Sequence, residues 1–256
     1  MPLKLIPEKI NKIGWIAANW PALDHIHAGT TTRIGGASGI PYDSFNLADH
    51  VGDNQKNVSH NRKLLRNQLN LPAEPYWLQQ VHGNRVIAAK IANSAEPADG
   101  IVTDQTNIVC TVLTADCLPL LLRNVHGTQI AAIHVGWRGF SKNIITNAIE
   151  TFAENRENII AWLGPCIGAS HYEIDDEVRN ACLNICGAAE HAFNPGRDGH
   201  WFADLHRLAK YQLAHLGIEN IYGGGYCTYG DANLFFSYRR DGITGRMASL
   251  IWMDSP

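Results

Sequence analysis

The 256-residue sequence has no run of about 18 apolar residues, so no segment is long and apolar enough to span a membrane as a helix. Its first residues, MPLKLIPEKINKIGW, lack the long apolar region and the small-residue cleavage site of a secretory signal. Basic residues are not in excess either, because the formal net charge is −3, which argues against a nucleic-acid-binding surface. We therefore expect a cytoplasmic protein that binds neither membrane nor nucleic acid.

The sequence also lacks internal repeats, low-complexity tracts, charge blocks and Pro/Ser linkers, and we expect one domain over residues 1–256. Its six cysteines are Cys110, Cys117, Cys166, Cys182, Cys186 and Cys227. In a reducing compartment, cysteines are free thiols or metal ligands rather than a disulfide framework.

Apolar periodicity predicts a chain that mixes helices and strands. Residues 28–54, rich in Gly, Ser and Asp, predict a long binding loop. Helical spacing is found over residues 58–71, 141–156, 178–186 and 205–216. Strand-like runs cover residues 76–83, 85–91, 100–104, 108–122, 128–137, 159–168, 220–229, 234–240 and 245–253. This mixture predicts an α/β or α+β fold, with a sheet buried on both faces near residues 108–137.

An acid and a thiol interrupt the apolar run LTADCLPLLL, residues 113–122. A turn at 124–127 predicts a hairpin, and if its centre lies between residues 125 and 126, Cys117 faces His134. Opposed Cβ atoms lie about 4.5–5.5 Å apart, a gap that a metal ion or a Cys–His pair can bridge. A slip of one residue would separate the two side chains, and Pro119 favours a bulge or a sheet edge. In a regular strand Asp116 points the other way and could orient neighbouring groups.

His82, in QVHGN, is the candidate third ligand of a metal site. Two imidazoles and one thiolate suit zinc, and three protein ligands leave a fourth position for water or substrate, as in catalytic zinc sites. The spacing of the three residues matches no zinc-finger motif. A buried thiol with two unrelated histidines is therefore the alternative interpretation.

Six ordered blocks give the chain a resemblance to a known family from about residue 28 to residue 252. The blocks are QVHGN, ADGIVT, TADCLPLLL, AIHVGWRG, LGPCIG and SYRRDGITGRMA. Together they resemble the bacterial YfiH-like proteins, first called multicopper polyphenol oxidases or laccase-domain proteins and later described as purine nucleoside phosphorylases with adenosine deaminase activity. The resemblance implies an α+β fold, a four-layer α/β/β/α sandwich with mixed sheets, similar to the catalytic domain of cytotoxic necrotizing factor.

The resemblance also implies zinc bound by His82, Cys117 and His134, the last two being catalytic. The reaction would be cleavage of adenosine, inosine or methylthioadenosine by phosphate, with deamination of adenosine as a further activity. Its partners are then a purine nucleoside and phosphate, and the protein is expected to be a monomer or a small homo-oligomer.

Phosphate requires fixed cations or backbone donors. Arg33 and Arg138 lie close to glycines in the sequence, and Arg239 and Arg246 lie in SYRRDGITGR; all four are candidates. Asn46, in the long loop, is a candidate polar group for proton transfer.

Three other functions stay open. Cys117 as nucleophile with His134 as base would make a cysteine hydrolase, acting on a cell-wall precursor or an amide. The same two histidines and thiolate suit copper, but three methionines and a single His-x-His pair argue against a polyphenol oxidase. A metal-dependent interaction module would not need the thiol.

Overall fold

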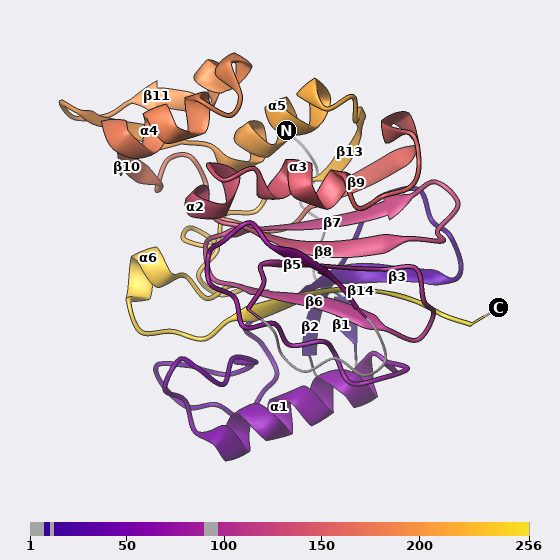
Figure 1. The fold of residues 1–256 in the computed structure, drawn as a ribbon. Helices are drawn as coiled ribbons and strands as arrows, with labels where there is room; N and C mark the ends of the chain where they lie inside the picture. Colours follow the sequence, from indigo (N-terminus) through magenta and orange to yellow (C-terminus); the bar gives the residue numbers. More distant parts are fainter. Residues whose placement is uncertain (1–7, 11–12, 90–96, 256) are drawn as a thin grey trace.

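The computed structural model describes residues 8–10, 13–89 and 97–255, which form two large β-sheets, a small third sheet and covering helices (Figure 1). The first sheet has five strands, and all its neighbouring pairs are antiparallel. In spatial order they are β1 (Glu8–Ile10), β2 (Ile13–Ala17), β3 (Ile26–Thr31), β14 (Met247–Met253) and β6 (Val109–Thr114).

The second sheet has six strands and is mixed, because its two outermost pairs are parallel and the others antiparallel. Its order is β13 (Asn220–Gly223), β9 (Ile159–Leu163), β7 (Leu118–Asn124), β8 (Ile130–Val135), β5 (Gly100–Thr103) and β4 (Val86–Ala88). A small antiparallel sheet consists of β10 (Glu173–Asp175), β12 (His200–Ala203) and β11 (Phe193–Pro195).

Six α-helices lie around the sheets in the described part of the chain. They are α1 (Gln55–Gln68), α2 (Trp137–Phe140), α3 (Ile144–Ile149), α4 (Asp176–Leu183), α5 (Leu205–His215) and α6 (Tyr238–Asp241), with 3₁₀ turns at Arg156–Asn158 and Gly187–Ala192. In Figure 1, α3 and α5 lie above the six-stranded sheet and α1 lies below the five-stranded sheet.

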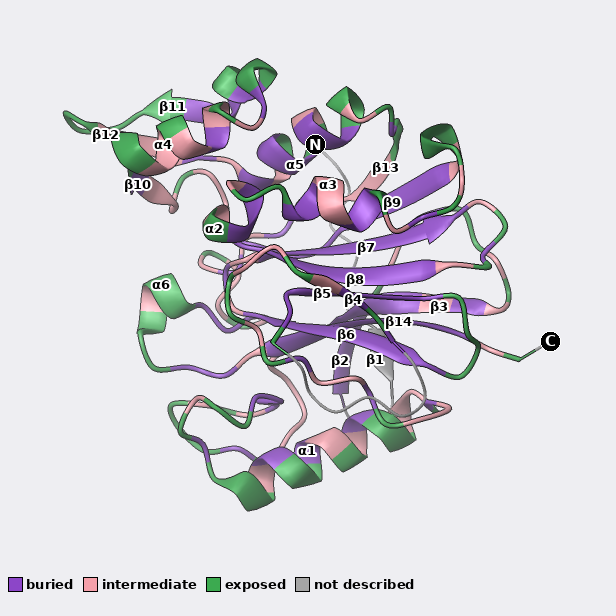
Figure 2. Cartoon of the chain, in the orientation of Figure 1, coloured by how far each residue is buried: buried purple, intermediate pink, exposed green. Residues whose placement is uncertain are grey.

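Strand β7 shows how the core is divided. Leu118, Leu120 and Leu122 pack with apolar residues of α3 and α5, whereas Leu121 packs between the two large sheets. A third apolar cluster joins the five-stranded sheet to Leu65 of α1. Figure 2 shows the result: the central strands are buried, while the helices are exposed on their outer sides. The predicted α+β fold and the doubly covered sheet are confirmed.

Local sequence signals explain the three longer helices. Asn54, Asp175 and Asp204 each accept a hydrogen bond from a backbone N–H in the first turn of α1, α4 and α5, which satisfies a donor that the helix leaves unpaired. Helix α5 ends just before Gly217, whose φ is +83°. These helices were all predicted, with starts that differ by three residues or fewer.

Several predicted elements are wrong. Residues 76–83 form no strand, because Gln80 binds the backbone N–H and C=O of Leu113 with its side-chain amide instead of joining a ladder. Residues 234–240 lead into α6 instead of forming a strand. The helix predicted over 141–156 is much shorter than expected: α3 is the one α-helix of that range, and Asn143, with its φ of +66°, separates it from α2, which ends at Phe140.

The predicted register of the β7–β8 hairpin is also wrong, by two residues. Pro119 pairs with His134, and Cys117 lies just before β7. The turn is longer than expected, because the Asn124 Oδ1 accepts hydrogen bonds from the backbone N–H groups of Thr128 and Gln129. A shift of two residues preserves the face of each side chain, so Cys117 and His134 still lie on one side.

The expectation of a bulge or edge at Pro119 is wrong as well, since β7 is an interior strand with regular pairing. Pro119 lies near the start of β7, one residue before the pairing of that strand with β9 begins at Leu120. Within the described part of the chain, no helix has the length and apolar character needed to cross a bilayer.

Because β7 is buried on both faces, leucine substitutions on either face should destabilise the protein. We expect Leu120→Ala, on the helix side, and Leu121→Ala, between the sheets, each to lower the free energy of unfolding by about 2–5 kcal/mol in urea titrations, because both side chains are fully buried. Ile243→Ala, at an exposed position, should change it by less than about 0.5 kcal/mol. A small loss at either leucine would contradict the two-sided core.

Candidate active site

His82, Cys117 and His134 meet at one end of the two large sheets. Each offers a ligand atom, and the three atoms lie within 4.8 Å of one another. The two imidazole rings are nearly perpendicular, with centroids 4.7 Å apart. His82 is exposed, Cys117 is half-buried and His134 is buried, so the group opens toward solvent on the His82 side. These three residues could hold one metal ion.

The buried carboxylate of Asp99 fixes both histidines. Its Oδ1 lies 2.8 Å from Nδ1 of His134, which leaves Nε2 of that ring available for a ligand. The same carboxylate accepts hydrogen bonds from the backbone N–H groups of Val81, His82 and Gly83, at 3.2, 2.9 and 2.6 Å. One side chain therefore joins the loop that carries His82 to the strand that carries His134.

Two residues of the site have left-handed backbone conformations, His82 with a φ of +56° and Asp116 with a φ of +96°. Such angles are uncommon for residues other than glycine, although Asn, Asp and His are found there more often than most. They persist where surrounding contacts over-determine the chain, and this is the case at both positions.

Asp116, the residue before Cys117, connects this part of the site to the segments that contain Thr228 and Arg239. Its Oδ1 accepts a 2.6 Å hydrogen bond from the Thr228 hydroxyl, and its Oδ2 accepts a 2.7 Å hydrogen bond from the Arg239 backbone N–H. Its backbone carbonyl accepts from the N–H of Ile167. Asp116 thus orients neighbouring groups, as the sequence suggested, although from a bend between β6 and β7 rather than from a regular strand.

The three groups of the Cys117–His134–Asp99 chain change one another's ionisation. Burial alone would raise the pKa of Cys117, but the charges and hydrogen bonds of His134 and His82 outweigh it and lower the pKa to about 6. Burial would lower the pKa of His134, but Cys117 and Asp99 raise it to about 9. Burial also opposes the charge of Asp99, yet its hydrogen bond with His134 holds the pKa of the carboxyl below its ordinary value. The thiolate, which is the ligand form of cysteine, is thus favoured near neutral pH.

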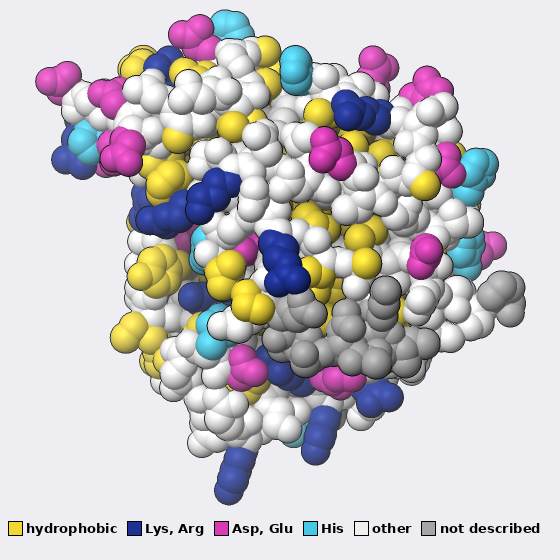
Figure 3. All heavy atoms as spheres, viewed as in Figure 1, with side chains coloured by type: hydrophobic (Ala, Val, Ile, Leu, Met, Phe, Trp, Pro, Cys, Tyr) yellow, Lys and Arg dark blue, Asp and Glu magenta, His cyan; other side chains and the backbone are white. Residues whose placement is uncertain are grey.

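A cavity of about 500 Å³ opens over this group. Its lining combines cationic side chains with aromatic ones: Arg138, Arg239, Arg246, Trp137, Tyr172 and Tyr238. On the face shown in Figure 3, basic, histidine and hydrophobic side chains gather near α2 and α6, the helices that border this cavity. The volume falls within the range of small-molecule sites.

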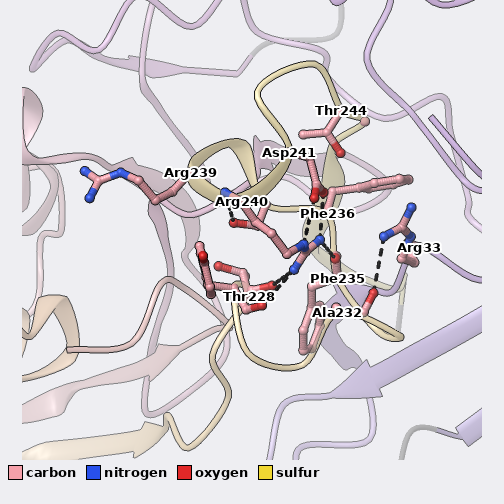
Figure 4. Close-up of polar contacts among 12 residues, drawn as sticks. Arg33, Thr228, Ala232, Phe235, Phe236, Arg239, Arg240, Asp241 and Thr244 are labelled. Carbon is pink, nitrogen blue, oxygen red and sulfur yellow. Dashed lines mark hydrogen bonds and ion pairs between the residues drawn. The ribbon is translucent and has the colours of Figure 1, made fainter. Parts of the chain in front are cut away.

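The structure brings Arg138 and Arg239 to this cavity but not Arg33. The guanidinium of Arg33 donates to the backbone carbonyls of Asp43 and Ala232 and pairs with the Asp43 carboxylate, and it borders a separate cavity. Figure 4 shows Arg33 and Arg239 extending to opposite sides of the loop around residues 228–244.

Asn46 is not brought to the cavity either. It is fully buried, and its amide group bonds the backbone of Ala48 and of Arg246 and the carboxylate of Asp53. Its contact with Arg246, which does line the cavity, makes Asn46 a support for that segment.

Arg240 explains why only one of two adjacent arginines reaches the cavity. Its guanidinium donates to the backbone carbonyls of Thr228, Tyr229 and Phe235 and pairs with Asp241 (Figure 4). Arg240 thereby ties α6 to the segment that contains Thr228, and its neighbour Arg239 is free to face the cavity.

The sequence did not single out Asp99, Trp137, Tyr172 or Tyr238. Asp99 lies in ADGIVT, directly before β5, and an acid at the start of a buried strand was the available signal. For the three aromatic residues no local signal distinguishes a cavity position from a core position, because the segments that meet there are distant in sequence.

Comparisons with known proteins find similar chains over nearly the whole length. A family model described as multi-copper polyphenol oxidoreductase laccase matches residues 27–254. A curated protein of Escherichia coli (strain K12), named purine nucleoside phosphorylase YfiH, is 46% identical over 241 residues, covering 93% of this chain and 98% of its own. A protein of Haemophilus influenzae named purine nucleoside phosphorylase is 43% identical over 241 residues, covering 93% and 99%.

Solved structures are similar in fold over nearly the whole chain. Protein NMB0706 of Neisseria meningitidis superposes with a TM-score of 0.90 at 40% identity, covering 94% of this chain and 99% of that one. YlmD from Geobacillus stearothermophilus gives a TM-score of 0.88 at 30% identity, covering 94% and 97%.

The role of Asp99 can be tested directly. Asp99→Asn keeps the size of the side chain but replaces one acceptor oxygen by an NH₂ group that faces backbone N–H donors. We expect the affinity for zinc, measured by competition with a chelator, to fall about 10–100-fold. Asp104→Asn, at an exposed carboxylate just after the same strand, is the matched control. Unchanged affinity in Asp99→Asn, with a native circular dichroism spectrum, would contradict this role.

Proposed function

The chain belongs to the family described as multi-copper polyphenol oxidoreductase laccase, and we propose that it is a zinc-dependent purine nucleoside phosphorylase. The observation that carries the proposal is a single cavity that joins a His–Cys–His group to three arginines and three aromatic side chains. Relatives that carry the name purine nucleoside phosphorylase support it. We extend the proposal to residues 1–256 as one catalytic domain.

The donor set fits zinc. Two imidazoles and a thiolate are borderline ligands, and the Asp99 contact with Nδ1 of His134 is the outer partner that metal-bound histidines usually have. A zinc ion bound there would supply a Lewis acid beside the bound nucleoside.

Copper is the alternative metal, and the methionines argue against a blue-copper site. Such a site uses a weak axial ligand, often methionine. Met247 and Met253 are buried in β14 and do not line the cavity, while Met1 lies outside the described residues. Within the described residues the cavity thus offers no methionine, and zinc is favoured.

The arginines supply the positive charge that phosphate needs. The guanidinium of Arg138 has no hydrogen-bond partner among the described residues and rests on the Trp137 ring, 4.5 Å from its centroid, so its donors are free for an oxyanion. Among the described residues, the guanidinium of Arg239 donates one hydrogen bond, to the backbone carbonyl of Glu173. Because a guanidinium can bind phosphate with two parallel N–H groups, these side chains suit the co-substrate.

The aromatic side chains suit the purine. Trp137, Tyr172 and Tyr238 line the same cavity as the arginines, so base and phosphate would be held side by side with the ribose between them. Holding both reactants in one orientation accounts for much of the rate of a two-substrate reaction. In the reaction, a phosphate oxygen bonds to C1′ of the ribose and the bond from C1′ to N9 of the purine breaks.

The finer assignments belong to the proposal. We include inosine, adenosine and methylthioadenosine as substrates of phosphorolysis. Deamination of adenosine at the same site, with water instead of phosphate as the attacking molecule, is also included.

A cysteine hydrolase is the second candidate, and one observation favours it. Burial opposes the charged forms of Cys117 and His134, yet their contact brings the two pKa values to about 6 and about 9, as in a thiolate–imidazolium pair able to attack a carbonyl. The proposed similarity of the fold to the catalytic domain of cytotoxic necrotizing factor would also support a hydrolase.

The deciding experiment is phosphorolysis of inosine by purified protein, followed as hypoxanthine and ribose 1-phosphate. We expect activity that requires phosphate, is lost with a chelator, returns with zinc and is absent in Cys117→Ala. A hydrolase would act without phosphate and survive chelation. Absence of phosphate-dependent cleavage in the zinc-loaded protein would contradict the proposal.

The choice between the arginines gives a second prediction. Arg138→Lys keeps the charge but loses the planar fork, and we expect the KM for phosphate to rise about tenfold, as for the loss of about 1.4 kcal/mol of binding. Arg33→Lys should leave that KM unchanged, since Arg33 lies outside the cavity. An effect of Arg33→Lys equal to that of Arg138→Lys would reverse the assignment.

A further inference from the structure

Tyr172 has an uncommitted hydroxyl at the active-site cavity. The residue directly precedes β10, where its backbone carbonyl accepts a hydrogen bond from the N–H of Ala203, so its position is fixed by the small sheet. Its ring packs against the core cluster of the six-stranded sheet. The hydroxyl has no hydrogen-bond partner among the described residues, although it belongs to a half-buried side chain.

Tyr172 lies between the active-site cavity and a second, smaller cavity. With Trp137 and Arg239 it lines both the 500 Å³ cavity and an adjoining cavity of about 270 Å³. The Arg239 guanidinium carbon lies 5.2 Å from the centre of the Tyr172 ring. The Tyr172 side chain therefore borders the space where a substrate would lie, and its hydroxyl, which has no partner among the described residues, is available to a ligand there.

Its ionisation suits a hydrogen-bond donor. Burial raises the pKa of Tyr172 above its ordinary value, so the phenol keeps its proton at neutral pH. The positive charge of Arg239 acts in the opposite direction and strengthens the O–H as a donor. The neighbouring arginines are suited to phosphate, whereas a neutral donor matches a group on which negative charge only develops during the reaction.

Building on the proposed phosphorolysis, we propose that Tyr172 is a catalytic residue that donates a hydrogen bond to N7 of the departing purine. As the C1′–N9 bond breaks, its electron pair passes into the purine ring, and part of that charge gathers at N7. An oxygen of hydrogen phosphate forms the new bond to C1′, and the proton that it releases neutralises the free base through water. Tyr172 keeps its own proton throughout.

The test compares inosine with 7-methylinosine in the zinc-loaded protein. The methylated base is cationic and leaves without a hydrogen bond at N7. We expect Tyr172→Phe to lower kcat for inosine about 100-fold and kcat for 7-methylinosine less than about threefold. Zinc content and the KM for phosphate should be unchanged. Tyr211→Phe, in α5 and outside the cavity, is the matched control and should match the wild type on both substrates.

The outcomes separate this inference from the proposed function. Equal losses on both substrates would make Tyr172 a structural residue and overturn the inference while leaving phosphorolysis standing. No loss on inosine would overturn it too. A wild-type protein that cleaves neither substrate with phosphate would overturn the proposed function, and the inference with it.

Discussion

The placement of His82 and His134 in the site depends on the hydrogen bonds of the Asp99 carboxylate. This carboxylate accepts hydrogen bonds from three consecutive backbone N–H groups of the loop at residues 81–83 and contacts the ring of His134. Residues 81–83 belong to no strand, and His82 has a left-handed backbone. Without this carboxylate, the three N–H groups would lose their hydrogen-bond acceptor in the protein, and His82 would have no fixed place beside Cys117 and His134.

Asp116 and Arg240 connect the three candidate metal ligands to the segments that line the cavity. Asp116 joins the bend before Cys117 to Thr228 and Arg239, and Arg240 holds the backbone of the segment that contains Thr228. The Asp99 carboxylate and the Arg240 guanidinium use their hydrogen bonds mainly on backbone groups, and the Asp116 carboxylate divides its two between a backbone N–H and a hydroxyl. The side chains that face the cavity, Arg138 and Tyr172 among them, are then free to meet a ligand. Rigid support combined with uncommitted donors is what a two-substrate site requires.

Local signals explain what the sequence could and could not predict. Helices α1, α4 and α5 follow from capping residues and apolar spacing, and β7 and β8 from apolar runs with a turn between them. The faces of Cys117 and His134 were predicted although the register was not, because an error of two residues preserves the face. Asn46 and Arg33 looked free in a polar loop, but the fold uses both for internal hydrogen bonds with residues up to 200 positions away. Such long-range contacts leave no trace in local composition.

The central claim is that His82, Cys117 and His134 bind one zinc ion that Asp99 helps to position. X-ray absorption spectroscopy of the protein, purified without added metal, tests this most directly. The account predicts about one zinc per chain with one sulfur ligand at about 2.3 Å and two nitrogen ligands at about 2.0–2.1 Å. Zinc without a sulfur ligand, or protein that gains no metal when zinc is supplied, would contradict it.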